Sequence, residues 1–336
     1  MDPRRGIDAV WARDGAGARA LAPLSWLFGA VTAARNAAFD LGLLRSYPLG
    51  LPAVSVGNLS VGGTGKTPIS AWLAQRFLSL GARPAILLRG YGDDEPLVHE
   101  RLTPGAIVVA DADRVRGAAT ARGRGAQVLV LDDAFQHRRA KRDLDIVLVA
   151  AEQARAHRLL PAGPFREPRS ALGRAQVLIV TRKRATRAEA DAVAAQWAAE
   201  QPALTIAVAS LAPGDLVRVG GSERKQVSSL RGAAVLAISA IGAPSTFEGQ
   251  LADMGATVES AAFADHHAFT DAEVGALAAR AAATGMVVCT LKDAVKLEGR
   301  WPRQAPALWY LSQAVTIERG AGALEGLLAR TVPATR

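Results

Sequence analysis

Up to residue 181, short runs of apolar and often β-branched residues alternate with polar or helical stretches. The runs are almost continuously hydrophobic, which is typical of parallel strands covered on both faces of a sheet. This pattern predicts a doubly wound α/β domain, whose ligands bind at the carboxyl ends of the strands. The expected strands are a run starting at Val54, then Pro84–Leu88, Ala106–Ala110, Gln127–Leu131, Asp145–Val149 and Val177–Thr181, with helices at Ile69–Leu80 and Arg187–Glu200.

A second, smaller α/β series begins near residue 231. Before it, Leu216–Val219 and Lys225–Ser228 flank the sequence Gly-Gly-Ser-Glu, whose turn chemistry predicts a β-hairpin linker. We therefore divide the chain into an N-terminal region (1–45), a first α/β core (46–213), a two-stranded linker (214–230) and a second α/β domain (231–336), whose C-terminal end could return to the core. The expected elements of the second domain are strands at Ala234–Ser239, Thr257–Ser260, Met286–Thr290 and Leu308–Leu311, and helices at Pro244–Met254, Asp271–Thr284 and Gly320–Ala329.

The N-terminal region contains a segment with helical spacing, Leu24–Leu44, which combines large apolar residues such as Trp26 with Arg35 and Arg45. A helix of this composition can lie in a membrane interface. It can equally pack against the body of the protein. The longest apolar stretch, Leu21–Ala34, is too short to span a bilayer, and no secretory signal is expected.

The most informative motif follows the first strand, where a glycine-rich loop leads into Lys66, Thr67 and a helix. Glycines let backbone N–H groups surround an anion, and the start of a helix adds partial positive charge. In a P-loop, the lysine reaches the β- and γ-phosphates and the hydroxyl ligates Mg²⁺. Ser60 stands where the P-loop pattern has its first glycine, and the alternative is a plain glycine-rich turn. The residues expected to bind nucleotide are Ser60, Val61, Gly62, Gly63, Thr64, Gly65, Lys66 and Thr67.

Carboxylates and basic residues follow other strands of the expected sheet. Asp132 and Asp133 end an apolar run, and adjacent carboxylates there favour a bound cation over a solvated turn. A basic block, from Phe135 to Arg142, would project toward the γ-phosphate. Arg166 and Glu167 lie in a loop stiffened by prolines, as active-site loops often require.

Two further motifs lie in the second series. Asp265, His266 and His267 are consecutive, and because neighbours in sequence seldom ligate one metal ion, a histidine oriented by a carboxylate as an acid–base group is the better interpretation. Lys292 and Asp293 follow a strand, where they could contact a nucleotide base or form a structural salt bridge.

The amino-acid composition limits the classes of molecule that the protein could bind. The chain has 336 residues, a formal net charge of +9 and a pI near 10.4, which together indicate anionic partners. Aromatic residues make up only 5%, which argues against a base-stacking nucleic-acid binder. Cys289 is the only cysteine, so an internal disulfide is excluded, a reducing compartment is expected, and the pattern around it predicts a core residue.

Taken together, the motifs resemble those of the tetraacyldisaccharide 4′-kinase family, the lipid A kinases of Gram-negative bacteria. They occur in the same order from the P-loop almost to the C-terminus, so the resemblance covers most of the chain. The matching segments are Gly57-Asn58, Gly62–Pro68, Arg89–Gly92, Asp94–Pro96, Asp132-Asp133, Phe135–Arg138, Pro161–Pro164, Arg166–Pro168, Asp265–His267 and Lys292–Lys296.

The resemblance implies ATP-dependent phosphorylation of the 4′-hydroxyl of a tetraacyldisaccharide 1-phosphate, with ATP and Mg²⁺. It implies that Asp94 accepts the hydroxyl proton and that His266 pairs with it across a cleft between the two domains, while Lys66 holds phosphate. Magnesium would be held by Thr67, Asp132, Asp133 and Glu167; substrate-binding or supporting residues would be Asn58, Arg89, Gln136, His137, Arg138 and Arg166.

The same resemblance places the protein at the cytoplasmic face of the bacterial inner membrane, as a peripheral or monotopic protein. Its partner would be an anionic glycolipid, with no nucleic acid and no obligate protein partner. Two other classes remain compatible with the residues: a P-loop kinase or ligase for a small soluble substrate, and a regulatory ATPase that transfers phosphate only to water.

Overall fold

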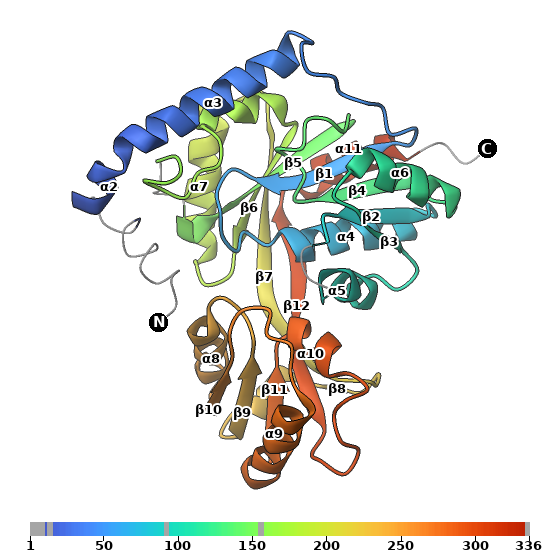
Figure 1. Cartoon of the computed structure of the whole chain (residues 1–336), viewed down its shortest axis with the longest axis vertical. Coiled ribbons are helices and arrows are strands. Elements are labelled where there is room, and N and C mark those ends of the chain that lie inside the picture. The colour runs from blue at the N-terminus through green and yellow to red at the C-terminus, as the bar shows by residue number, and fades with distance from the viewer. Residues whose placement is uncertain (1–10, 12–15, 91–93, 154–157, 333–336) are drawn as a thin grey trace. The chain divides into compact units, whose positions relative to one another are not determined.

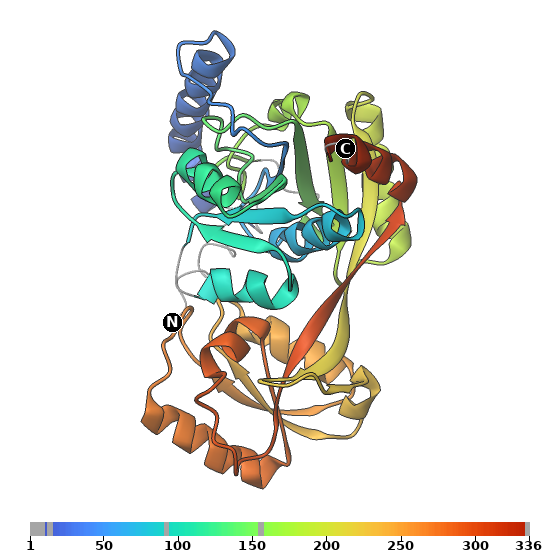
Figure 2. The ribbon, with the colours of Figure 1, turned by 90° about the vertical axis from the view of Figure 1, so that its right-hand side faces the viewer.

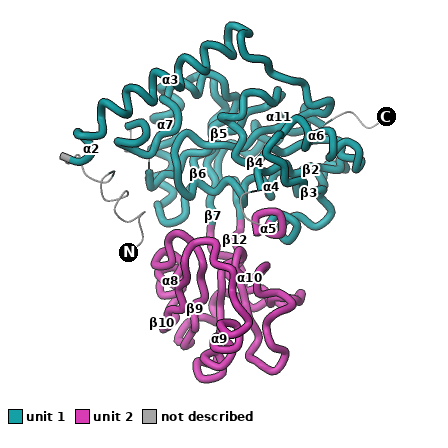
Figure 3. Tube along the Cα trace, viewed as in Figure 1, with its two compact units in different colours: residues 1–90, 99–211, 315–336 teal, residues 91–98, 212–314 magenta. Residues whose placement is uncertain are grey.

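The computed structural model describes residues 11, 16–90, 94–153 and 158–332 (Figure 1). The chain forms two compact units (Figure 3): unit 1 comprises residues 1–90, 99–211 and 315–336, and unit 2 comprises residues 91–98 and 212–314. Three described elements have residues in both units: the helix α5 (Asp94–Leu102) and the two long strands β7 (Thr205–Arg218) and β12 (Leu308–Arg319). The C-terminal residues thus belong to unit 1.

Unit 1 contains the parallel sheet expected from the apolar runs. Its strands lie in the order β6-β5-β1-β4-β2-β3, with β7 next to β6. All of these neighbours pair in parallel. The strand bounds are β1 Ala53–Asn58, β2 Pro84–Leu88, β3 Ile107–Ala110, β4 Val128–Asp132, β5 Leu144–Ala150 and β6 Val177–Arg182.

Both faces of this sheet are buried under helices, which explains why its strands read as continuous apolar runs. On β4, Val128 and Val130 pack in one cluster with residues of α4 (Lys66–Ser79) and α11 (Ala321–Thr331). Leu129 and Leu131 point to the opposite face, where they pack with α6 (Arg114–Gly123). Farther along this second face, Trp197 of α7 (Arg187–Glu200) packs with residues of β5 and β6. Figure 2 shows helices on both sides of the sheet. The doubly wound α/β class is confirmed.

Unit 2 is a smaller α/β unit. Its strands β9 (Ala234–Ser239), β10 (Thr257–Ala262) and β11 (Met286–Cys289) pair in parallel, and β11 also pairs with β12. One face packs on α9 (Asp271–Thr284) and the other on α8 (Pro244–Asp253). Cys289 is fully buried in the cluster with α9, as its apolar surroundings predicted. The expected hairpin is present, because β8 (Arg224–Lys225) pairs antiparallel with the end of β7.

Several elements differ from the sequence expectations. The strand expected to end at Leu311 continues to Arg319, and β7 was not expected to begin at Thr205. Both strands contain polar residues where they leave the core, so hydrophobicity alone underestimates them. Short helices were also missed: α2 (Ala16–Ala20), α5 (Asp94–Leu102), α6 and α10 (Leu291–Leu297), with 3₁₀ turns at Ala151–Gln153, Arg169–Arg174 and Val227–Leu230.

The N-terminal helix is shorter than expected. The helix α3 spans Ala22–Asp40 and ends four residues before Leu44. Gly42 has a φ of 74°, a conformation that favours glycine and that terminates helices. In the described part of the chain, no helix has the length and apolarity needed to cross a membrane.

Candidate active site

The glycine-rich loop joins the carboxyl end of β1 to the amino end of α4, which begins at Lys66. Gly62 and Gly65 have φ values of 118° and 89°, which residues with a side chain rarely adopt. A Cβ on Gly65 would also lie 2.2 Å from Cδ1 of Leu211. Both glycines are therefore required by the backbone, and the loop opens onto the positive end of a 14-residue helix.

Neighbouring strands hold the loop in shape. Asn58 donates from Nδ2 to Oγ1 of Thr64 at 2.9 Å, and Thr181 donates from Oγ1 to the carbonyl oxygen of Thr64 at 2.9 Å. Lys183 donates from Nζ to the carbonyl oxygen of Gly63 at 2.8 Å. Burial is the main reason that the pKa of Lys183 is lowered. The sequence reasoning missed Thr181 and Lys183, although their position at the end of β6 was a usable signal.

Asp132 lies beside the loop because β4 pairs with β1, with Val56 opposite Asp132. Its carboxylate is buried and fully engaged: Ser70 donates to Oδ1 at 3.0 Å, and Nε2 of His99 lies 3.0 Å from Oδ2. Burial by itself raises the pKa of Asp132, but His99 and Lys66 outweigh it, so the pKa is lowered. His99, at 1% exposure, was not anticipated, because nothing in its local sequence marks it.

Asp133 faces the mouth of the loop. Its carboxylate lies 3.7 Å from Nζ of Lys66 and 3.0 Å from Nη1 of Arg166, and its side chain is 40% exposed. Its φ of 48° is in the left-handed region, which is strained for a residue other than glycine. Lys66, Asp133 and Arg166 therefore meet at one place, as the motifs suggested.

Glu167, which we expected to hold magnesium together with Asp132 and Asp133, has its own set of partners in the structure. Its side chain is buried, and its two oxygens bind Nη2 of Arg174 at 3.1 and 2.9 Å. Nδ2 of Asn36 in α3 donates to the same carboxylate at 2.8 Å. Among the described residues, no cluster of three or more His, Cys, Asp or Glu side chains could hold a metal ion. In the structure, the carboxylate of Glu167 is thus paired with the guanidinium group of Arg174.

The other residues that the sequence predicted as substrate-binding or supporting residues differ in their contacts. Gln136 donates to the carbonyl oxygen of Asn58 at 2.9 Å and so supports β1. Burial, followed by the charges of Arg114 and Arg142, lowers the pKa of His137 to about 4, so its ring is neutral at pH 7. Arg138 is directed to α3, where it donates to Asp40 at 2.6 Å. Arg89 is exposed after β2, whereas Tyr91 and Gly92 of the same motif lie outside the described residues.

Asp94 and His266 are brought together within unit 2. We expected Asp94 to belong to the first core, but residues 91–98 group with unit 2, so this contact lies inside one unit. Nδ1 of His266 lies 3.2 Å from Oδ1 of Asp94, and Nζ of Lys296 lies 3.4 Å from Oδ2. Burial by itself raises the pKa of Asp94, but the charges of Lys296, His266 and Lys292 together outweigh burial and lower the pKa. The carboxylate is therefore ionised at neutral pH.

His266 has a φ of 59°, the second non-glycine residue with a left-handed backbone that the structure records, after Asp133. Such strain concentrates at functional sites. Asp293, by contrast, is part of the scaffold: it is fully buried and accepts from Thr290 Oγ1 at 2.6 Å and from the backbone N–H of Ala240 at 3.1 Å. The interpretation of Lys292 and Asp293 as a mutual salt bridge or base-contacting pair gains no support from these contacts.

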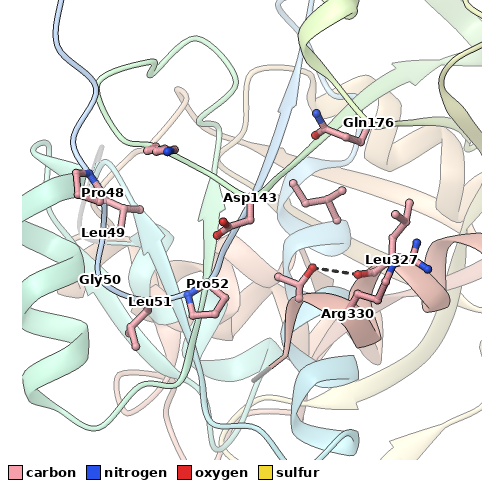
Figure 4. Close-up of a pocket in the computed structure, with 12 residues that line it drawn as sticks. Pro48, Leu49, Gly50, Leu51, Pro52, Asp143, Gln176, Leu327 and Arg330 are labelled. Carbon is pink, nitrogen blue, oxygen red and sulfur yellow. Dashed lines mark hydrogen bonds between the residues drawn. The ribbon is translucent and has the colours of Figure 1, made fainter. Parts of the chain in front are cut away.

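A pocket of about 640 Å³ opens at the amino ends of β1 and β5, the edge of the sheet opposite to the glycine-rich loop (Figure 4). Its lining includes Leu49, Lys141, Leu144, Leu327 and Arg330. None of the residues expected at the active site lines it.

A parallel α/β sheet with a glycine-rich phosphate loop, a lysine at the start of the following helix and an acidic strand end defines a P-loop nucleotide-binding protein. Comparison with known proteins identifies the kind: the family model described as tetraacyldisaccharide-1-P 4′-kinase matches residues 17–94 and 92–332. The chain belongs to this kinase family, which confirms the assignment made from the motifs.

Relatives named tetraacyldisaccharide 4′-kinase are similar over most of their length. The protein from Anaeromyxobacter sp. (strain Fw109-5) is 41% identical over 82% of both chains. The protein from Anaeromyxobacter dehalogenans (strain 2CP-C) is 39% identical over 96% of this chain and 95% of its own. A crystal structure of LpxK from Aquifex aeolicus in complex with ATP matches with a TM-score of 0.73 and 29% identity, covering 94% of this chain and 99% of that one.

Proposed function

We propose that the protein transfers the γ-phosphoryl group of ATP to the 4′-hydroxyl of a tetraacyldisaccharide 1-phosphate, the reaction in the family's name. The observation that carries this proposal is the meeting of Lys66 and Asp133, 3.7 Å apart, at the mouth of the glycine-rich loop. Phosphoryl transfer is mainly positioning and neutralisation of charge. Backbone N–H groups of the loop and Lys66 hold the β- and γ-phosphates, and Arg166 supplies a second cation beside Asp133.

Magnesium fits the side of the loop that Thr67 and Asp133 form. A hydroxyl and an exposed carboxylate oxygen are the hard donors that Mg²⁺ prefers. Asp132 is buried with both oxygens engaged, which suits a residue that positions Asp133, whose backbone N–H donates to Oδ1 of Asp132 at 3.0 Å. Held by Thr67 and Asp133, the ion would supply positive charge that neutralises the phosphates during transfer.

Asp94, paired with His266, accepts the proton of the sugar hydroxyl. A carboxylate is a weak base, and an adjacent imidazole stabilises the proton once it has left the hydroxyl. Lys296 holds the other carboxylate oxygen and fixes the orientation of Asp94.

Incubation of the protein with ATP and the disaccharide 1-phosphate, followed by mass spectrometry of the lipid, tests this function. A product heavier by one phosphoryl group is expected. ATP hydrolysis without lipid modification would instead indicate a regulatory ATPase, and transfer only to soluble acceptors would indicate a different kinase.

Replacement of Asp133 with asparagine should raise the Mg²⁺ concentration needed for half-maximal activity by at least ~10-fold, since one charged ligand is lost. The measurement is a Mg²⁺ titration of initial rate at saturating ATP. Asp191→Asn is a matched control, because Asp191 is likewise a partly exposed carboxylate with two basic partners, Arg319 at 3.6 Å and Arg187 at 3.7 Å. An unchanged titration for Asp133→Asn would remove Asp133 from the metal site.

We also propose that α3 binds the cytoplasmic surface of the inner membrane, where the lipid substrate resides. Its side chains Trp26, Leu27 and Val31 are 75%, 63% and 60% exposed, which is unusual for large apolar residues. A pocket of about 580 Å³ beside Trp26 is lined by Arg19, Gly29 and Leu159 among others, a mixture that suits an acyl chain with an anionic group.

The variant Trp26→Ser/Leu27→Ser should bind anionic vesicles at least ~10-fold more weakly, because interfacial helices gain affinity from buried apolar area. Vesicle sedimentation measures the binding. Leu80→Ser, at an exposed apolar position directly after α4, serves as the control. Wild-type binding by the double variant would favour a helix that merely packs on unit 1.

A further inference from the structure

The second histidine of the Asp-His-His motif has no part in the proposed reaction, yet its ring is held on three sides. Nε2 of His267 lies 3.0 and 3.1 Å from the two carboxylate oxygens of Glu273. The ring stacks on Phe263 at 5.0 Å between centroids, and Phe269 meets it edge-on at 5.5 Å. This ring cannot turn without breaking a charged hydrogen bond and two aromatic contacts.

Glu273 is itself fixed by the start of α9. Its carboxylate accepts from the backbone N–H of Thr270 at 2.7 Å and from the Thr270 hydroxyl at 2.9 Å, which completes a capping box. The Thr270 N–H is the main cause, and His267 the next, of a lowering of the pKa of Glu273 to about 2. An ionised carboxylate only accepts hydrogen bonds, so Nε2 of His267 carries the proton.

His266 lies in the loop between β10 and α9, and the residue that follows it, His267, is therefore anchored to the start of α9. Nζ of Lys296, which also contacts Asp94, lies 3.4 Å from the carbonyl oxygen of His267. The N–H of His266 donates to the carbonyl oxygen of Ala240 at 3.2 Å, which anchors the other side. A left-handed backbone at a histidine is unfavourable, so it persists only where its neighbours hold it.

We propose that His267 and Glu273 are positioning residues that hold His266 in its left-handed conformation against Asp94, with α9 as the rigid base. The proposal rests on the function proposed for the Asp94–His266 pair. Neither positioning residue contacts substrate; each acts through the backbone next to His266. Displacement of a reacting group by about 1 Å can lower the rate ~10²-fold, so loss of the anchor should affect turnover and spare ATP binding.

The chain offers a matched control for the loss of a helix cap. Glu189 forms a capping box with Thr186 at the start of α7, in unit 1, with the same three distances of 2.7, 2.9 and 3.2 Å. Glu189→Ala and Glu273→Ala remove equivalent caps, and should lower the melting temperature by similar amounts. Only Glu273→Ala removes the partner of His267.

Steady-state kinetics with the lipid acceptor form the first test. We expect Glu273→Ala and His267→Phe each to lower kcat by ~10- to 10²-fold with unchanged KM for ATP. Glu273→Gln, which keeps an acceptor for the cap and the ring, should recover most of the loss. Glu189→Ala should stay near wild type. If Glu273→Ala does not fold, His267→Phe decides, because it preserves the stack on Phe263. Wild-type kcat in folded His267→Phe would overturn the proposal.

Imidazole ¹⁵N–¹H spectra form the second test, which is independent of activity. The chain has five histidines, so assignment by single substitutions is practical. The His266 resonances should move in Glu273→Ala and remain in place in Glu189→Ala; unmoved resonances in Glu273→Ala would contradict positioning. His266→Asn, assayed in parallel, separates the two hypotheses: wild-type turnover by that variant refutes the acid–base role, while the spectra still report on the anchor.

Discussion

Replacement of Lys66 with alanine is expected to reduce kcat by at least ~10²-fold, the effect of removing one group that stabilises charge in the transition state. Lys66 begins α4, directly after the glycine-rich loop, and its ammonium group lies 3.7 Å from Asp133. The variant also leaves Asp133 with Arg166 as its remaining ion-pair partner among these contacts, at 3.0 Å. Initial rates of lipid phosphorylation at saturating ATP measure the loss.

Lys225→Ala is a suitable control for this experiment. Lys225 lies in β8 and stacks over Trp309, with its Nζ 4.4 Å from the ring centroid, away from the glycine-rich loop in sequence and in a different unit. Its removal should leave the rate unchanged. If Lys66→Ala folds and retains activity within a few-fold of wild type, the P-loop interpretation of residues 60–67 fails.

Substitution of the Asp94–His266 pair is expected to lower kcat by ~10²–10⁴-fold for either single variant, the range for positioned acid–base groups. Asp94→Asn keeps the shape of the carboxylate, and His266→Asn is preferable to alanine because asparagine tolerates the φ of 59° found at this position. The KM for ATP should barely change, because neither residue contacts the P-loop residues of unit 1 in the hydrogen bonds described above.

The double variant makes the test specific to a pair. Since Nδ1 of His266 lies 3.2 Å from Asp94, the two side chains should act as a unit, and their losses should not add. A double variant hardly slower than the slower single variant is expected. Fully additive losses would show that Asp94 and His266 act in separate steps.

Local sequence was sufficient for the sheet of unit 1 and for the phosphate loop. Strands buried on both faces must be apolar at every position, as Val128–Leu131 are, and such runs are recognisable without tertiary information. Glycines at positions 62 and 65 indicate a loop with backbone angles that other residues rarely adopt. The extended ends of β7 and β12 were missed for the converse reason, because strands that leave the core lack an apolar signature.

The residue types alone indicated the chemistry available at the strand ends: a lysine after the glycines, two carboxylates at the end of β4, and histidines after β10. Which of these groups pair depends on how the chain folds. The folded structure pairs Glu167 with Arg174, Asp132 with the unforeseen His99, and Asp94 with Lys296. The physical reason is that a carboxylate takes its role from the charge and burial around it. The partners that supply this charge come from elements far away in the chain: His266 follows Asp94 by 172 residues, and Lys296 follows it by about two hundred.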